Sequence, residues 1–205
     1  MSSNQVLLNR LAVYGGAFDP IHNGHLATVA QLLASGQVDN VVIVPSGDRP
    51  DKRIAVSAAD RLLMTQRAIA EAFPNDARVA VSDVHTLGTV GYGTIDLVDY
   101  FKSLPLTDPY VVIGRELLPD LSQWKESSRL CATAQFIIID RPGVSPGGLP
   151  VGLRASMLRT SYQAGVLVSS STIRTLLSQG LSCAGLMPQS VIALCKSRGF
   201  YGAGR

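Results

Sequence analysis

The 205-residue sequence has few charged residues and no long apolar run. Charged side chains make up 16% of it and no long block of like charges occurs, which argues against a disordered chain or a charged tail. The net charge of +3 comes from scattered basic residues, so we expect no nucleic-acid partner. A membrane helix needs about 20 apolar residues, so we also expect no membrane span.

Cysteine is scarce. Only Cys131, Cys183 and Cys195 occur, and no two of them have Cys-x-x-Cys spacing. We therefore expect neither a disulfide framework nor a cysteine-built zinc site, and a reducing compartment is the simplest interpretation. Residues 1–10 lack the apolar segment of a signal peptide, so the expected location is the cytoplasm.

What the sequence does contain is 46% hydrophobic residues, arranged as short apolar runs that alternate with longer amphipathic stretches. At roughly 150 residues per domain, residues 1–205 fit a single domain. The expected strands are residues 11–14, 41–44, 78–82, 110–113, 136–139 and 166–168. The expected helices are residues 24–35, 57–73, 94–103, 171–178 and 189–197.

Apolar strands that alternate with helices predict an α/β fold, with a doubly wound, mostly parallel sheet and helices on both faces. The Gly- and Pro-rich residues 143–152 are interpreted as an internal loop. In such sheets, ligands bind beyond the carboxyl ends of the strands, where the strand order reverses. The motifs that follow all lie at predicted strand ends.

The most informative segment is GGAFDPIHNGHL, residues 15–26, after the first predicted strand. Gly15 and Gly16 allow the backbone to turn sharply and approach a ligand. The start of the next helix offers unpaired N–H groups and a positive dipole end, which suit a phosphate. His22 and His25 are three residues apart, so both can reach phosphoryl oxygens there and stabilise negative charge during transfer.

The same histidine pair could belong to a metal site or to an ordinary turn. It has no third strong ligand nearby and lacks the glutamate of a zinc-protease helix. We favour phosphate binding because a glycine turn and a buried strand precede the pair. A metallohydrolase built on His22 and His25 remains the alternative.

A second motif, VSSSTIR at residues 168–174, opens the predicted helix near the end of the chain. The hydroxyls of Ser169, Ser170 and Ser171 can cap that helix or donate to a phosphate. Arg174 adds a planar, charged fork that matches phosphate oxygens. The alternative is an ordinary capped helix with a surface arginine.

Residues 15–26 resemble the His-x-Gly-His signature of adenylyltransferases and cytidylyltransferases, and are especially similar to nicotinate mononucleotide adenylyltransferases. Residues 168–174 resemble that family's Ile-Ser-Ser-Thr-x-Ile-Arg signature. The resemblance implies a Rossmann-like fold and catalytic roles for His22, His25, Lys52 and Arg174. The implied ATP-binding residues are Gly15, Gly16, Ala17, Phe18, His22, His25, Gly114, Glu116, Ser169, Ser170, Ser171 and Arg174.

The middle of the chain also resembles the family. Residues 114–116 resemble the family's Gly-x-Asp pattern, with Glu116 in place of the Asp, and Trp124, the only tryptophan, follows eight residues later. The family's tryptophan stacks on the pyridine ring. Trp124 could instead anchor a surface helix. Lys52 lies where the family has a loop ending in His-Lys, and a solvated basic loop is the alternative there. Arg61 and Met64 match the family's helix pattern.

The acceptor region is where the sequence departs from the family. The family has Ser-Tyr-Thr-x-Asp-Thr-Leu, whereas residues 91–96 read GYGTID, with His85 upstream. The acceptor-binding residues implied by the resemblance are Tyr92, Thr94, Trp124 and Arg141. Because of this departure, nicotinamide mononucleotide and, more remotely, phosphopantetheine stay open as acceptors beside nicotinate mononucleotide.

The resemblance implies transfer of AMP from ATP to nicotinate mononucleotide, which gives deamido-NAD and pyrophosphate in NAD biosynthesis. Its partners would be ATP and a pyridine mononucleotide, with Mg²⁺ bound through the ATP phosphates. A nucleotide-binding module without catalysis is a further alternative. The sequence leaves the oligomeric state open, a homo-oligomer included.

Overall fold

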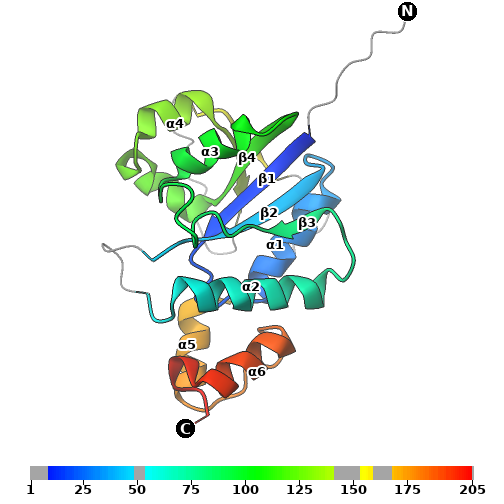
Figure 1. Cartoon of the computed structure of the whole chain (residues 1–205), viewed down its shortest axis with the longest axis vertical. Coiled ribbons are helices and arrows are strands. Elements are labelled where there is room, and N and C mark those ends of the chain that lie inside the picture. Colours follow the sequence, from blue (N-terminus) through cyan, green and yellow to red (C-terminus); the bar gives the residue numbers. More distant parts are fainter. Residues whose placement is uncertain (1–8, 49–53, 141–152, 159–167, 205) are drawn as a thin grey trace, which may run out of the picture.

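The structure is a computed structural model that describes residues 9–48, 54–140, 153–158 and 168–204. Figure 1 shows a twisted sheet with helices packed on two sides. Along the chain the elements are β1 Asn9–Gly16, α1 Asn23–Ala34, β2 Asn40–Pro45, α2 Ala58–Ala72, β3 Val79–Val81, α3 Thr94–Ser103, β4 Thr107–Gly114, the 3₁₀ segment η1 Arg115–Gln123, α4 Ser127–Thr133, β5 Gln135–Ile139, β6 Ala155–Met157, α5 Ser170–Ser178, α6 Gln189–Arg198 and η2 Phe200–Gly202.

The six strands of the sheet are all parallel and lie in the order β3-β2-β1-β4-β5-β6. The chain starts at the centre with β1, moves outward to β3, and returns to place β4 on the other side of β1. The strand order therefore reverses between β1 and β4, which confirms the predicted Rossmann-like, doubly wound fold. Such a reversal opens a crevice at the carboxyl ends of the two central strands.

Both faces of the central strands are buried, and successive side chains of each strand point to opposite faces. In β1, Ala12 and Tyr14 belong to the core that packs with α1, α2, α5 and α6, whereas Val13 packs with α3. In β4, Val112 faces the first core, and Val111 and Ile113 face the core formed with α3, η1 and α4. Burial on both sides explains why the strands read as continuous apolar runs.

The five helices expected from the sequence correspond to α1, α2, α3, α5 and α6, each within one residue at either end. The elements η1, α4 and β6 were not expected. The first contains Pro119, the second has seven residues, and the third has three residues at the edge of the sheet, so none carries a clear periodic pattern. The strand expected at residues 166–168 lies, apart from Val168, outside the described residues.

Candidate active site

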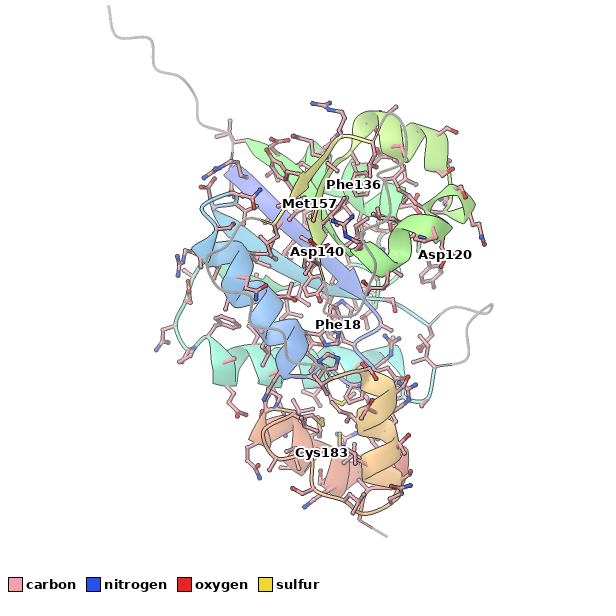
Figure 2. The ribbon with its side chains drawn as sticks, turned by 180° about the vertical axis from the view of Figure 1, so that it is seen from behind. Phe18, Asp120, Phe136, Asp140, Met157 and Cys183 are labelled. Atoms are coloured by element: carbon pink, nitrogen blue, oxygen red, sulfur yellow. The ribbon has the colours of Figure 1, made fainter. Side chains whose placement is uncertain are left out.

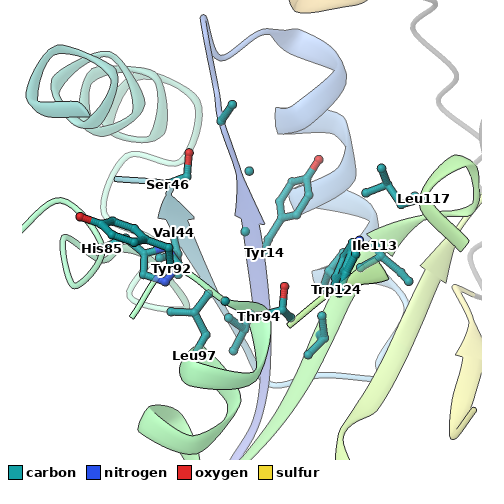
Figure 3. A pocket seen from close by; sticks show the side chains of 18 of the residues that line it. Tyr14, Val44, Ser46, His85, Tyr92, Thr94, Leu97, Ile113, Leu117 and Trp124 are labelled. Carbon is teal, nitrogen blue, oxygen red and sulfur yellow. The ribbon is translucent and has the colours of Figure 1, made fainter. Parts of the chain in front are cut away.

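A cavity of about 1210 Å³ lies at the carboxyl ends of β1, β2 and β4, where the strand order reverses (Figure 3). The β1–α1 turn forms one part of its wall, and the start of α3 and the end of η1 form another. The predicted site residues that line it are Gly15, Gly16, Ala17, Phe18, His25, Tyr92, Thr94, Gly114, Glu116 and Trp124. Residues from both predicted sets, for ATP and for the acceptor, therefore line one cavity.

Aromatic packing fixes the turn that follows β1. Phe18 is buried, and its backbone has φ +48°, in the left-handed region. Its ring meets the rings of Tyr14 and His25 edge-on, with centroids 5.5 Å and 4.9 Å away. The same ring would lie 3.0 Å from a Cβ at Gly16, so a larger residue at that position would displace it. The glycine thus leaves room for the ring of Phe18, the residue labelled at this turn in Figure 2.

The histidine pair lies at the start of α1, as its spacing predicts. The two rings stack, with centroids 3.6 Å apart, and the backbone N–H of His22 donates to Nδ1 of His25 at 3.2 Å. Because Nδ1 accepts this bond, the proton of a neutral His25 ring lies on Nε2. His25 lines the cavity, whereas the ring of His22 is buried, 3% exposed, and stacks against the ring of His25. A Cβ at Gly24 would lie 3.0 Å from the His22 ring, so this glycine permits the stacking.

Asp19 joins three distant segments at the turn. It is buried, and its Oδ1 accepts from the Tyr201 hydroxyl at 2.6 Å while Oδ2 accepts from the Ala55 N–H at 3.2 Å. Its carbonyl oxygen accepts from Nη1 of Arg174 at 2.7 Å. Burial, followed by the hydrogen bond to Asp19, raises the pKa of Tyr201, so its hydroxyl remains a donor. The sequence carried no signal for this role, because Asp19 and Tyr201 are 182 positions apart.

The serine-headed helix α5 lies directly against the same turn. The Ser170 hydroxyl donates to the carbonyl of Pro20 at 2.9 Å, and the Ser169 hydroxyl caps the helix by accepting a backbone N–H at 3.1 Å. Arg174 donates from Nη2 to the Ser171 hydroxyl at 3.1 Å. The two motifs from opposite ends of the chain therefore meet. In this structure their side chains bind protein groups, and none of the four predicted residues of α5 and its cap is among those lining the cavity.

The residues predicted for the acceptor come from the other half of the cavity. Trp124 and Thr94 point into it from the end of η1 and the start of α3, and Tyr92 lies beside His85 near the end of β2 (Figure 3). The rings of His85 and Tyr92 have centroids 6.3 Å apart, and His85 is 5% exposed. An aromatic wall on one side and a helix start on the other suit a flat ring that bears a charged group.

The start of α3 is held by Asp96. Its carboxylate accepts from the Gly93 N–H at 2.9 Å and from Nζ of Lys125 at 2.7 Å. Burial acts to raise the pKa of Asp96, but the hydrogen bonds from Lys125 and Gly93 outweigh it, so this pKa lies below its usual value. Asp96 thus forms a charged cap at the start of α3, beside Gly93 and Thr94 of the cavity lining.

The acid predicted for the nucleotide site folds back over the end of β4. The Glu116 carboxylate occupies the space that a Cβ at Gly114 would take, which explains the Gly-x-acid pattern. Glu116 and Asp120 are two acidic residues among those that line the cavity. Lys52 and Arg141, predicted for the triphosphate and for the acceptor, lie outside the described residues.

The described part of the chain also bears on metal sites and membrane spans. Within residues 9–48, 54–140, 153–158 and 168–204, no three His, Cys, Asp or Glu side chains gather in a way that could hold a metal ion. No helix of these segments is long and apolar enough to cross a bilayer. Cys131, Cys183 and Cys195 are free thiols.

Comparison with known proteins identifies the family of the chain. The cytidylyltransferase-like family model matches residues 13–176. Probable nicotinate-nucleotide adenylyltransferases of Tropheryma whipplei (strain Twist) and Synechococcus sp. (strain JA-2-3B'a(2-13)) are 31% and 33% identical, over 91% and 89% of this chain and 97% and 92% of theirs.

The fold is similar to that of Plasmodium falciparum nicotinic acid mononucleotide adenylyltransferase complexed with NaAD. The TM-score is 0.81 at 20% identity, over 94% of this chain and 97% of that chain. The family match includes the β1–α1 turn and most of α5, the two motifs that the hydrogen bond from Ser170 to Pro20 joins. The chain therefore belongs to the nicotinate-nucleotide adenylyltransferases, a family of cytidylyltransferase-like nucleotidyltransferases.

Proposed function

We propose that the protein transfers the adenylyl group of ATP to nicotinate mononucleotide, giving deamido-NAD and pyrophosphate for NAD biosynthesis. One observation carries the proposal: a single cavity runs from the β1–α1 turn and His25 to Trp124 and the start of α3. The first part suits a triphosphate and the second suits a pyridine ring. The names of the two relatives, both probable nicotinate-nucleotide adenylyltransferases, support the same reaction.

The ATP phosphates would lie along the turn and the start of α1. There Nε2–H of His25 and the positive end of the helix dipole favour negative charge. Gly15, Gly16, Ala17 and Phe18 would let the nucleotide approach the backbone. The proposed ATP site is completed by His22, Lys52, Gly114, Glu116, Ser169, Ser170, Ser171 and Arg174.

The acceptor would lie with its ring on Trp124 and its phosphate toward the ATP half. Tyr92 and Thr94 would shape the pocket from the α3 side, and Arg141 remains part of the proposal. A pyridinium ring gains from both stacking and cation–π attraction on an indole. Asp96 would keep the start of α3 in place.

Chemically, the reaction is an in-line displacement. An oxygen of the acceptor's 5′-phosphate bonds to the α-phosphorus of ATP as the bond to the bridging oxygen of pyrophosphate breaks. The attacking group is already an anion, so no protein base is required. Catalysis then consists of aligning two anions and offsetting their repulsion, which is the work assigned to His25, Lys52 and Arg174.

A Mg²⁺ ion would arrive with ATP, because this cation is usually held by substrate phosphates and one or two carboxylates. The carboxyl groups of Glu116 and Asp120 on the cavity lining fit that set of ligands. When bound, the ion draws off charge that develops on the leaving pyrophosphate. We also place the reaction in a reducing cytoplasm, consistent with the three free thiols.

The decisive assay measures pyrophosphate release from ATP and Mg²⁺ with nicotinate mononucleotide, nicotinamide mononucleotide or phosphopantetheine as acceptor. We expect the highest kcat/KM with nicotinate mononucleotide. A preference for either other acceptor would contradict the proposed substrate. ATP binding without pyrophosphate release for any acceptor would contradict catalysis and favour a binding module.

A further inference from the structure

Arg61 of α2 is a fully buried charged residue outside the cavity wall, with 0% of its surface exposed. Its Nη1 donates to the carbonyl oxygen of Ala17 at 2.7 Å and to the Ser46 hydroxyl at 3.3 Å. Its Nη2 donates to the carbonyl of Gly47 at 3.4 Å and to Oδ1 of Asp48 at 3.2 Å. Its Nε donates to the carbonyl of Val56 at 3.1 Å. The guanidinium thus bonds to two separate connections, β1–α1 and β2–α2.

These two connections form different parts of the cavity. Ala17 lies in the turn proposed to bind the ATP phosphates. The backbone of Gly47 lies against the acceptor side, because a Cβ there would be 2.5 Å from the His85 carbonyl oxygen and 2.6 Å from Cε1 of Tyr92. His85 and Tyr92 both line the cavity. One side chain therefore ties the ATP half to the acceptor half.

Only an arginine can make this set of bonds. Its N–H groups form a rigid planar fork that reaches acceptors on several sides, whereas a lysine presents one compact ammonium on a flexible stem. Burying a charge is costly unless its N–H groups are hydrogen-bonded. The buried guanidinium therefore favours the arrangement in which both connections accept hydrogen bonds from it.

We propose that Arg61 is a positioning residue that sets the distance and orientation between the ATP-binding turn and the acceptor wall. The inference rests on the proposed function. In-line transfer depends on the alignment of two substrates, and a misplacement of about 1 Å can slow a reaction by about 100-fold. Each substrate still finds its own half of the cavity, so loss of the fork lowers kcat much more than it raises either KM.

The test compares Arg61→Lys with Met64→Ala. Met64 lies on the same helix, is equally buried and packs its Sδ 3.8 Å from Sγ of Cys195 in α6, and its thioether donates no hydrogen bond to either connection. We expect Arg61→Lys to lower kcat by about 100-fold while both KM values stay within about threefold of the wild type. Met64→Ala should lower the unfolding temperature. At about 20 °C, well below unfolding, its kcat should stay near that of the wild type.

Two results would overturn the inference. One is a kcat for Arg61→Lys within about threefold of the wild type. The other is an equal loss of kcat in Met64→Ala, which would show that lower stability, and not lost positioning, causes the loss of kcat.

Hydrogen exchange supplies a readout that does not depend on activity. Arg61→Lys should lose amide protection at residues 15–18 and at residues 46–48 together, and Met64→Ala should lose it at neither. If the wild type transfers no adenylyl group, the proposed function fails, and exchange still decides whether Arg61 joins the two connections. Unchanged exchange at both segments in Arg61→Lys would refute that.

Discussion

Replacing His25 with Asn separates its two roles in the structure. Nδ1 of His25 accepts from the His22 backbone, and Nε2 carries the N–H assigned to the ATP phosphates. An Asn side chain reaches only the first position. Loss of one donor aimed at developing charge costs about 10²–10³ in kcat, or about 3–4 kcal/mol. Loss of the ring contacts with His22 and Phe18 should also cost about 1–2 kcal/mol of unfolding free energy.

A Gln at the same position is the matched control, because its amide nitrogen reaches about where Nε2 lies. We expect His25→Gln to recover about tenfold in kcat over His25→Asn. Steady-state pyrophosphate release at saturating ATP measures both variants, and urea unfolding checks that each is folded. A folded His25→Asn variant with kcat near that of the wild type would refute the donor role. Equal rates for the two variants would refute the assignment to Nε2.

Three further changes probe other parts of the site and the fold. Trp124→Leu should raise the acceptor KM by about 5–30-fold and leave the ATP KM unchanged, and equal acceptor KM values would contradict stacking. Tyr201→Phe removes the donor to Asp19 and should lower the free energy of unfolding in urea by about 1–2 kcal/mol; no loss would contradict the assigned bond. Glu71 accepts from the N–H groups of Gln189 and Ser190. Hydrogen bonds from Ser190, and to a smaller extent the one from Gln189, lower the pKa of Glu71 below its ordinary value of 4.5. That stabilisation is complete above pH 4.5 and is lost as the pH falls through the folded-state pKa. Glu71→Gln should therefore lower the free energy of unfolding by about 0.5–1 kcal/mol at neutral pH, after allowance for solvent screening. A difference in unfolding free energy between variant and wild type that persists in acid would contradict this.

The sheet could be predicted because its strands are buried on both sides. A run such as residues 41–44 has no polar face, and short runs of that kind separated by helical patterns specify a parallel α/β sheet. The contact between the two histidines could also be predicted, because residues three apart at a helix start meet through local geometry alone.

Roles that depend on long-range partners could not be read in the same way. Arg61 occupies a position that is compatible with a surface arginine until the folded chain brings Ala17 and Gly47 around it. Asp19 looks like a turn residue until Tyr201 reaches it from the end of the chain. Local patterns set elements and their boundaries, whereas partners across the fold emerge only from packing.

The most direct test of the central claim is a crystal structure of the protein with a non-hydrolysable ATP analogue and Mg²⁺. The triphosphate should lie over Ala17 and Phe18 within hydrogen-bond distance of Nε2 of His25, with its α-phosphorus facing the half of the cavity that contains Trp124. A nucleotide bound elsewhere, or a triphosphate that does not contact the β1–α1 turn, would contradict it.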